Sequence, residues 1–393
     1  MKHFPLFISL LFINVLIIFS ISCYGPEPDP DESPYKEEDR LTSWDHINQL
    51  IVRPDNWQRI ASNTNLFQLG DFTFSHNSSY NGYTEDFSKL VQSESEEYNR
   101  SYGTFPAIDG STVLLPMAAE FGWQFLDLSD GNTIRFFNFS TTHNAYLKLI
   151  GAHGENNNTE GTILEFINQI GDTYYFKNYN FKKQPDIIFA TSPSAAELAI
   201  AHNRGVALTI KPVCYDSFVF ITHIDNPVDN LTAEQIRGIY SGQITNWSEV
   251  GGDDKEITAF QRNPGSGSQT AMEEIVMNGI KMMDAPIGWY IAAMGRLVEF
   301  VAEYQNESNS IGYTFKYYVD RLYTNPKIKI IKIDDVEPND NNVRNQTYPF
   351  VAPYNGVIRS ADENGIGGKF LDWMLSEEGQ RSISQAGYVS ITQ

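Results

Sequence analysis

The chain has 393 residues, of which 41% are hydrophobic and 20% charged, and its formal net charge is -21. This length allows a sizeable buried core and predicts two or three compact units rather than one. The composition is that of a folded chain, which excludes a largely disordered protein. The strong negative charge excludes nucleic acid as a partner, because nucleic-acid binding needs a basic surface. It does not exclude a small anion, which a desolvated site binds through local donors while distant charges are screened.

The N-terminus has the pattern of an export signal. A short basic start precedes an apolar run over residues 6–19, and Ser22 stands directly before Cys23. This arrangement resembles the cleavage box of bacterial lipoproteins, although the usual leucine three residues before the cysteine is missing. We therefore expect residues 1–22 to be a signal peptide, Cys23 to be the lipidation site, and the acidic, Pro-rich residues 23–40 to be a tether. The alternative is an uncleaved membrane anchor, for which the apolar run is short.

The cysteine count fits this interpretation. Cys23 and Cys214 are the only cysteines, so a lipidated Cys23 leaves no partner for a disulfide bond. Cys214 lies in a strand-like context that predicts a buried, inert thiol. Neither a CxxC motif nor a His/Cys cluster occurs, so we expect no metal site, and the sequence indicates no other cofactor.

The next segments divide into an extension and an alternating region. Residues 41–100 form an N-terminal extension to which the sequence assigns no chemistry. From residue 104 onward, strand-like and helix-like runs alternate, which is typical of an α/β fold. Helices are expected over residues 116–125, 145–150, 162–170, 195–203, 232–241, 268–278, 288–304 and 367–386. Strands are expected over residues 133–139, 186–190, 208–212, 218–223, 257–261, 311–315, 327–333 and 354–359. Thr232 and Gln235 have the spacing of a capping box at one helix start.

A Gly-rich segment after the expected strand 257–261 has the strongest chemical signal. Gly265 and Gly267 allow the backbone to curl, so that successive N–H groups point into one concavity. Ser266 and Ser268 add hydroxyls, and Arg262 supplies a bidentate fork for a tetrahedral oxyanion. The pattern favours an anion cradle over a flexible Gly-Ser loop with a serine cap. No Gly-Lys-Ser/Thr follows, so nucleotide hydrolysis in a P-loop is disfavoured.

Three other helix starts are also rich in hydroxyl groups. They are residues 109–112, 140–142 and 190–194, and each taken singly is an ordinary N-terminal cap. A buried oxyanion needs many neutral donors, because burying it against few would cost several kcal/mol. The four helix starts together therefore predict a single oxyanion site.

Several motifs follow one another in a fixed order. They are Gly110-Ser111-Thr112, Asn226-Pro227-Val228, residues 231–242, residues 244–247, Arg262 with residues 265–268, and residues 375–380. In this order they resemble the phosphate-binding proteins of phosphate ABC importers, from about residue 104 to the end. The resemblance implies an α/β, two-lobed periplasmic-binding-protein fold with two hinge crossover strands. Lobe 1 would comprise residues 101–213 and 346–393, and lobe 2 residues 214–345.

The resemblance also implies a ligand set drawn from both lobes. Lobe 1 would contribute Ser111 and Thr112, helped by Thr141 or Thr142 and by Ser192, and lobe 2 would contribute Arg262, Ser266, Gly267 and Ser268. No residue is expected to be catalytic or to bind a metal.

This chain departs from the family at four places. Ser268 stands where the family usually ends its Gly-rich turn with Thr, which keeps a hydroxyl. Pro193 stands near the position where many members have an Asp or Arg that contacts the ligand. An Asp acceptor would recognise a protonated phosphate and repel sulfate, so its absence leaves the choice of anion open, with Asp109 as a possible substitute. Residues 151–184 are longer than the family norm, and residues 41–100 have no counterpart.

We therefore expect an extracytoplasmic, lipid-anchored, monomeric binding protein that delivers phosphate to a membrane ABC permease. The alternatives of the same kind are a sensor or a binder of another oxyanion such as molybdate or sulfate. A secreted hydrolase is a different possibility, but no GxSxG or HExxH motif supports it, and His143 is more simply a solvated loop histidine. A surface adhesin is a third possibility, for which only the Tyr-rich extension argues.

Overall fold

A computed structural model describes the greater part of the chain from Ile51 onward. The described residues are 51–67, 70–75, 97–100, 105–126, 137, 139–152, 161–170, 173–181, 184–285, 290–291, 294–303 and 308–392. The chain divides into two units, residues 1–48 and 49–393, and all of these described residues lie in the second. The expected signal peptide, lipidation site and tether lie outside the described residues, as does most of the expected strand 133–139.

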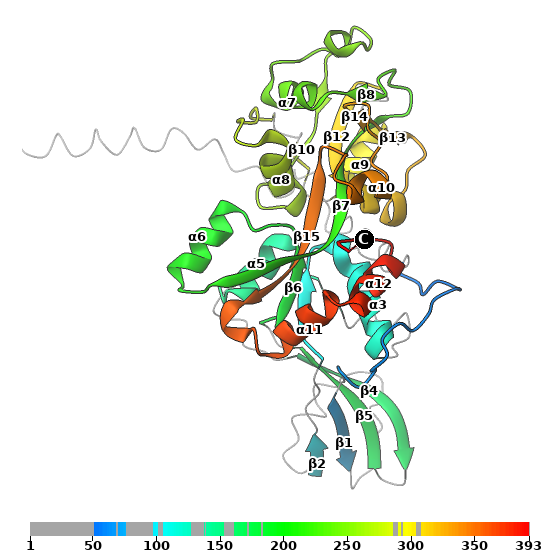
Figure 1. The fold of residues 1–393 in the computed structure, drawn as a ribbon, viewed down its shortest axis with the longest axis vertical. Helices are drawn as coiled ribbons and strands as arrows, with labels where there is room; N and C mark the ends of the chain where they lie inside the picture. Colours follow the sequence, from blue (N-terminus) through cyan, green and yellow to red (C-terminus); the bar gives the residue numbers. More distant parts are fainter. Residues whose placement is uncertain are drawn as a thin grey trace, which may run out of the picture. The chain divides into compact units, whose positions relative to one another are not determined.

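The centre of the fold is one long mixed sheet (Figure 1). Its strands follow the order β3 (Ile108–Gly110), β6 (Ile187–Ala190), β15 (Val351–Arg359), β7 (Leu208–His223), β12 (Ser310–Phe315) and β9 (Thr258–Ala259), while β13 (Ile328–Ile330) and β16 (Val389–Ser390) also pair with β7. The β-branched and aromatic residues of β7 suit a strand, and its second half is almost entirely buried. The first half of β7 pairs with β15 and its second half with β12. β7 therefore runs through both halves of the sheet, which we call the first lobe (β3, β6) and the second lobe (β12, β9).

The two strands expected over residues 208–212 and 218–223 are thus one strand. Pro212 lies where the first expected strand ends, and proline lacks the N–H that a sheet requires. The structure accommodates it at a register shift: Tyr354 lies opposite Cys214, and the next residue, Asn355, lies opposite Pro212. Val213 is the extra residue of this bulge. A bulge of this kind tolerates proline and bends the strand locally.

Helices cover the sheet in both lobes (Figure 1). The first lobe contains α3 (Leu115–Phe125), α5 (Thr142–Leu149), α6 (Ala195–Asn203), α11 (Ile366–Met374) and α12 (Glu377–Gln385). The second contains α7 (Ala233–Ser241), α8 (Gly267–Ala271), the π-helix η3 (Met272–Met277), α9 (Met294–Glu303) and α10 (Asp340–Arg344), and two small parallel pairs, β8 (Asn230–Leu231) with β14 (Lys332–Ile333) and β10 (Gln261–Arg262) with β11 (Tyr290–Ile291). The expected capping box is confirmed at α7.

Aromatic packing holds the helices of the first lobe on the sheet. The Phe121 ring makes edge contacts with Phe189, Phe370 and Trp373, at centroid distances of 5.8, 5.5 and 5.4 Å. Each such pair adds about 0.5–1.5 kcal/mol beyond the burial of its area. This cluster joins α3, β6 and α11, and so fixes the strand ends from which the candidate site is built.

A second sheet joins the extension to the insertion after residue 151. It is antiparallel, in the order β2 (Glu97–Arg100), β1 (Gly70–Ser75), β5 (Thr173–Phe181) and β4 (Gly161–Ile170). The helix expected over residues 162–170 was wrong, because this segment is β4. Its apolar residues fit a helical spacing, but they are mostly β-branched or aromatic, and pairing with β5 decides the outcome. The helix expected from residue 288 also starts late, because residues 290–291 form β11 and α9 begins at Met294.

Residues 51–67 form a strap along the first lobe. The Trp57 indole donates to Glu120 at 2.9 Å, and Gln124 Oε1 on α3 accepts from the backbone N–H groups of Ile60 and Ala61 at 2.7 and 3.0 Å. Gln385 on α12 donates to the carbonyl of Gln58 at 2.9 Å. At least this part of the extension therefore docks on the lobe. Within the described part of the chain, every helix is too short or too polar to cross a membrane.

Candidate functional site

The Gly-rich turn of the second lobe lies against two hydroxyls of the first. A β-carbon placed on Gly267 would lie 2.7 Å from Thr142 Oγ1 and 3.1 Å from Thr191 Oγ1. These three residues come from three helix starts far apart in the sequence. The structure therefore brings together the Gly267 turn and two of the other helix starts.

Ser111 and Thr191 follow neighbouring parallel strands. β3 pairs with β6, with Gly110 opposite Phe189, and the Ser111 N–H donates to the Phe189 carbonyl at 2.8 Å. The carboxyl ends of parallel strands meet at one edge of a sheet, where α/β proteins bind ligands. Both residues are buried at 4% exposure, and Thr191 Oγ1 has no hydrogen-bond partner among the described residues. A buried hydroxyl without a partner costs about 1–3 kcal/mol, which a bound ligand would offset.

The structure distinguishes the two threonines at the start of α5. Thr142 is buried, and its hydroxyl faces Gly267. Thr141 is exposed and has a φ of +80°, a region that non-glycine residues rarely adopt. Such strain persists only where the surrounding structure enforces it. The Thr142 hydroxyl is therefore the one placed to meet a ligand beside the turn.

Arg262 is buried behind the turn, at 5% exposure. Its Nε donates to the Ile291 carbonyl at 2.8 Å, and its Nη1 lies 3.3 Å from the Ser268 hydroxyl, which is fully buried. Its backbone N–H donates to the Tyr313 hydroxyl at 2.9 Å. Burial lowers the pKa of Arg262, because the low-dielectric interior disfavours its charge. The guanidinium is thus held in one orientation beside Ser268.

The backbone of the turn explains its glycines and serines. Gly265 has a φ of +78°, in the left-handed region that favours glycine. Ser266 caps α8, and its hydroxyl oxygen accepts from the Gln269 N–H at 3.2 Å. The Ser266 hydroxyl therefore serves the helix first, although its proton stays available for a further bond.

His143 contacts the turn from the first lobe. Its Nδ1 lies 2.8 Å from Glu197 Oε1, and a β-carbon on Gly265 would lie 3.6 Å from its ring. The expected solvated loop histidine is therefore a half-exposed residue oriented by a buried carboxylate. Burial, followed by the charges of Glu273 and Glu197, raises the pKa of Glu274 on the second lobe. The sequence did not identify Glu197 as part of this region.

Asp109 supports the site rather than facing it. One carboxylate oxygen accepts from the Gly110 and Ser140 N–H groups, both at 2.7 Å. The other accepts from the Ser140 hydroxyl at 2.6 Å and from Lys148 at 3.0 Å. Asp109 thus fixes the segment that leads into Thr142, and its oxygens are already occupied.

The remaining expected ligands are less closely placed. Thr112 begins the short helix η1 (Thr112–Leu114), and Ser192 precedes Pro193; both are half-buried. No hydrogen bond within the described residues fixes either side chain. Thr191 rather than Ser192 supplies the hydroxyl that meets the turn.

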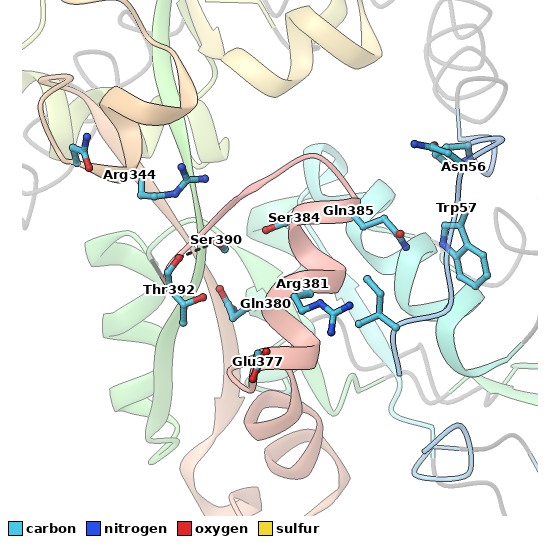
Figure 2. A pocket seen from close by; sticks show the side chains of 13 residues that line it. Asn56, Trp57, Arg344, Glu377, Gln380, Arg381, Ser384, Gln385, Ser390 and Thr392 are labelled. Carbon is cyan, nitrogen blue, oxygen red and sulfur yellow. Dashed lines mark hydrogen bonds between the residues drawn. The ribbon is translucent and has the colours of Figure 1, made fainter. Parts of the chain in front are cut away.

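A separate cavity of about 940 Å³ lies away from these residues. It is bounded by the strap, α12 and the end of α10, and Figure 2 shows the exposed side chains of Arg344 and Arg381 on its walls. None of the expected ligand residues lines it. Among the described residues, no group of three or more His, Cys, Asp or Glu side chains could hold a metal ion.

Comparison with known proteins gives the family. A family model described as PBP superfamily domain matches residues 156–378, more than half of the chain. The phosphate-binding protein PstS of Bacillus subtilis is 28% identical over 170 residues, which cover 43% of this chain and 53% of that protein. PstS of Borreliella burgdorferi is 25% identical over 182 residues, which cover 45% of this chain and 64% of that protein. The chain thus spans between half and two thirds of the length of these relatives.

A solved structure supports the fold over a longer stretch. It is a candidate phosphate ABC transporter substrate-binding protein with bound phosphate from Clostridium perfringens. It is 26% identical, with a TM-score of 0.51, and the match covers 72% of this chain and 98% of that one. The expected α/β binding-protein fold is therefore confirmed, and the chain belongs to the PBP superfamily.

Proposed function

We propose that this protein is an extracytoplasmic solute-binding protein that captures phosphate between its two lobes for an ABC importer. The observation that carries the proposal is the meeting of Gly267 with the Thr142 and Thr191 hydroxyls, with a buried Arg262 beside it. The relatives named as phosphate-binding proteins, and the bound phosphate in the Clostridium perfringens protein, favour this anion.

Capture would work by replacing water with fixed donors. Thr142, Thr191 and Ser111 would donate from the first lobe, and the Gly267 turn and Arg262 from the second. Hydrogen bonds that involve a charged group are roughly twice as strong as neutral ones, and a planar guanidinium matches two oxygens of a tetrahedral anion. Closure of the lobes would exclude water and bring both sets of donors onto the same oxygens. All of these groups would act as hydrogen-bond donors to an intact anion, so we propose binding and not catalysis.

A second candidate function is binding of another oxyanion, such as sulfate or molybdate, because the carboxylate of Asp109 is already occupied. Its carboxylate is occupied by Ser140 and Lys148, and Pro193 supplies no acceptor. Without a free carboxylate, only neutral oxygens would accept the proton of a phosphate, so the site would discriminate less against sulfate or molybdate. Calorimetric competition between phosphate, sulfate, molybdate and phosphonates on the purified protein tests this. Phosphate should bind most tightly, and an equal affinity for sulfate would establish a general oxyanion binder.

Direct binding is the test of the function itself. A ligand that binds only the folded state stabilises it, by about 2.7 kcal/mol when the ligand concentration is one hundred times Kd. This stabilisation raises the melting temperature. We expect phosphate, and not chloride at equal ionic strength, to raise the melting temperature. Turnover of a phosphate ester would instead support a secreted hydrolase.

We also propose that the protein is anchored to the membrane through a lipid on Cys23, close to its permease. The support is the sequence alone: an apolar run, a small residue and then the cysteine. Membrane fractionation of the wild type and of Cys23→Ser tests it. The wild type should sediment with membranes and the variant should not.

A further inference from the structure

A buried carboxylate lies where the lobes join. Asp216 lies in β7 at 7% exposure, beside the position at which β7 changes its partner from β15 to β12. Its Oδ1 accepts from the Ser217 N–H at 2.7 Å, and its Oδ2 accepts from the Tyr354 hydroxyl on β15 at 3.2 Å. The N–H of Tyr317, two residues after the end of β12, also donates to Oδ2 at 3.2 Å. One carboxylate thus joins both crossover strands to the second lobe.

Tyr317 continues this connection into the first lobe. Its ring stacks on Tyr388 with a centroid distance of 4.1 Å and an angle of 6°, and its hydroxyl donates to the Ala386 carbonyl at 2.9 Å. Gly387, with a φ of +92°, passes so close that a β-carbon there would lie 3.3 Å from the Tyr317 ring. The stack is therefore a tight contact between the end of β12 and the turn between α12 and β16.

The connection ends at the candidate site. The Tyr388 hydroxyl is buried and donates to the Val113 carbonyl at 2.6 Å. Val113 directly follows Ser111 and Thr112, and it belongs to the same short helix as Thr112. A displacement of Tyr317 would thus change the position of the backbone that carries Ser111, one of the proposed ligands.

We propose that Asp216 is a positioning residue for the ligand site: it holds Tyr317 against the hinge, and the Tyr317–Tyr388 stack sets the Ser111–Thr112 backbone. The inference rests on the proposed function for the identity of the ligand, but the coupling of Asp216 to lobe position stands independently of it.

The protonation of Asp216 should control this arrangement. Burial raises the pKa of Asp216 to about 7, while its bonds to Ser217, Tyr317 and Tyr354 and the charge of Lys316 act in the opposite direction. A cavity of about 70 Å³ adjoins the carboxylate, so a small movement of the hinge would admit water to it. The charged form gains more from hydration than the neutral form does. Deprotonation should therefore favour the more open arrangement of the lobes.

Other titratable groups face Asp216 from every element packed against it. They are Lys316, Tyr317, Asp320 and Arg321 from the segment after β12, Asp340 from α10, Tyr348 and Tyr354 at β15, Tyr388 at β16, and Cys214 on β7 itself. Lys316 pairs with Asp320, so its charge is already partly satisfied. Burial raises the pKa of Cys214 and of the four tyrosines well above neutrality. Burial thus acts on Asp216 in the opposite sense to a favourable ion pair, because it raises the pKa of this carboxyl to about 7.

A distance measurement in the ligand-free protein tests the coupling. Cysteines at Leu198 on α6 and Lys281 in the second lobe, both exposed, would carry spin labels in a Cys23→Ser background, while the buried Cys214 stays unlabelled. We expect a longer mean distance between the labels at pH 8.5 than at pH 5.5. Asp216→Asn should keep the pH 5.5 distance at both pH values, because the amide imitates the neutral acid. A response to pH that persists in Asp216→Asn, or that is absent from the wild type, would overturn the proposal.

Phosphate binding tests the connection to the ligand site. Tyr388→Phe removes the bond to Val113 and should weaken phosphate binding about fivefold. Ser310→Ala is the matched control, because its buried hydroxyl also donates to a carbonyl, that of Val301, at 3.1 Å, at the end of β12 far from Tyr317. The control variant should lose a similar amount of stability and keep its affinity for phosphate. If both variants lost the same affinity, Tyr388 would have only a structural role. Failure of the wild type to bind phosphate would refute the proposed function, whereas the label distances would still decide the role of Asp216.

Discussion

Replacement of Arg262 by alanine should remove most of the affinity for phosphate. Arg262 is the one cation among the proposed ligands, and it is buried at 5% exposure with its Nε fixed by the Ile291 carbonyl. Loss of one partner from a buried ion pair costs about 3–5 kcal/mol, because the remaining charge stays buried without compensation. With about 1.4 kcal/mol for each factor of ten, Kd should rise by about two to three and a half powers of ten.

Arg237 provides a matched control for this variant. Its Nε also donates to a carbonyl, that of Val276 at 2.7 Å, in the same lobe but outside the candidate site. Titration calorimetry with phosphate should show a large loss for Arg262→Ala and unchanged affinity for Arg237→Ala, with melting curves confirming that both variants fold. Wild-type affinity in Arg262→Ala, or an equal loss in Arg237→Ala, would show that the guanidinium does not bind the anion.

Three further predictions concern the turn, the unpartnered hydroxyl and the hinge. Gly267→Ala places a methyl group 2.7 Å from Thr142 Oγ1, so calorimetry should show at least a tenfold loss of phosphate affinity, and unchanged binding would contradict the location of the site. Thr191→Val removes a buried hydroxyl that has no hydrogen-bond partner among the described residues, so the ligand-free melting temperature should stay equal or rise while affinity falls about tenfold; a clear loss of ligand-free stability would argue against a ligand role. Asp216 has its folded-state pKa raised from 3.8 to about 7, so its contribution to stability is full below pH 3.8 and is lost as the pH rises through 7. Asp216→Asn should therefore raise the free energy of unfolding more at pH 8 than at pH 5, by on the order of a few kcal/mol, and equal gains at both pH values would contradict the shift.

The sequence predicted correctly those local features that depend on a few neighbouring residues, namely one turn and one helix cap. The glycines and serines of the 262–269 turn, and the Thr232–Gln235 capping box, act on neighbouring residues, so their effect can be derived from spacing alone. The turn indeed follows a short strand and starts a helix, although that helix is only five residues long before it widens into η3.

Features that depend on distant partners could not be predicted in the same way. β4 has an apolar spacing that fits a helix, and only its pairing with β5 makes it a strand. Two strands were expected where β7 is one, and a bulge beside Pro212 opposite β15 keeps that strand continuous. Ser192 and Thr191 are adjacent hydroxyl residues, and only the approach of Gly267 from the other lobe distinguishes them. Glu197 gave no signal, because its role depends on His143, which lies 54 positions earlier.

The strap has a consequence for the order in which the protein matures. Gln58 and Gln385 are 327 positions apart, yet they are hydrogen-bonded, and Ser62 is joined in the same way to Glu378. A chain that emerges from a translocation channel with its N-terminus first exposes the strap long before α12 exists as a partner. The contacts of the strap with α12 must therefore wait until almost all of the polypeptide has been delivered, whereas its contacts with Glu120 and Gln124 on α3 can form early. The bonds of Gln58 and Ser62 to α12 would mark the completion of the molecule, and proteolysis near Ser62 should be faster in unfinished chains than in finished ones.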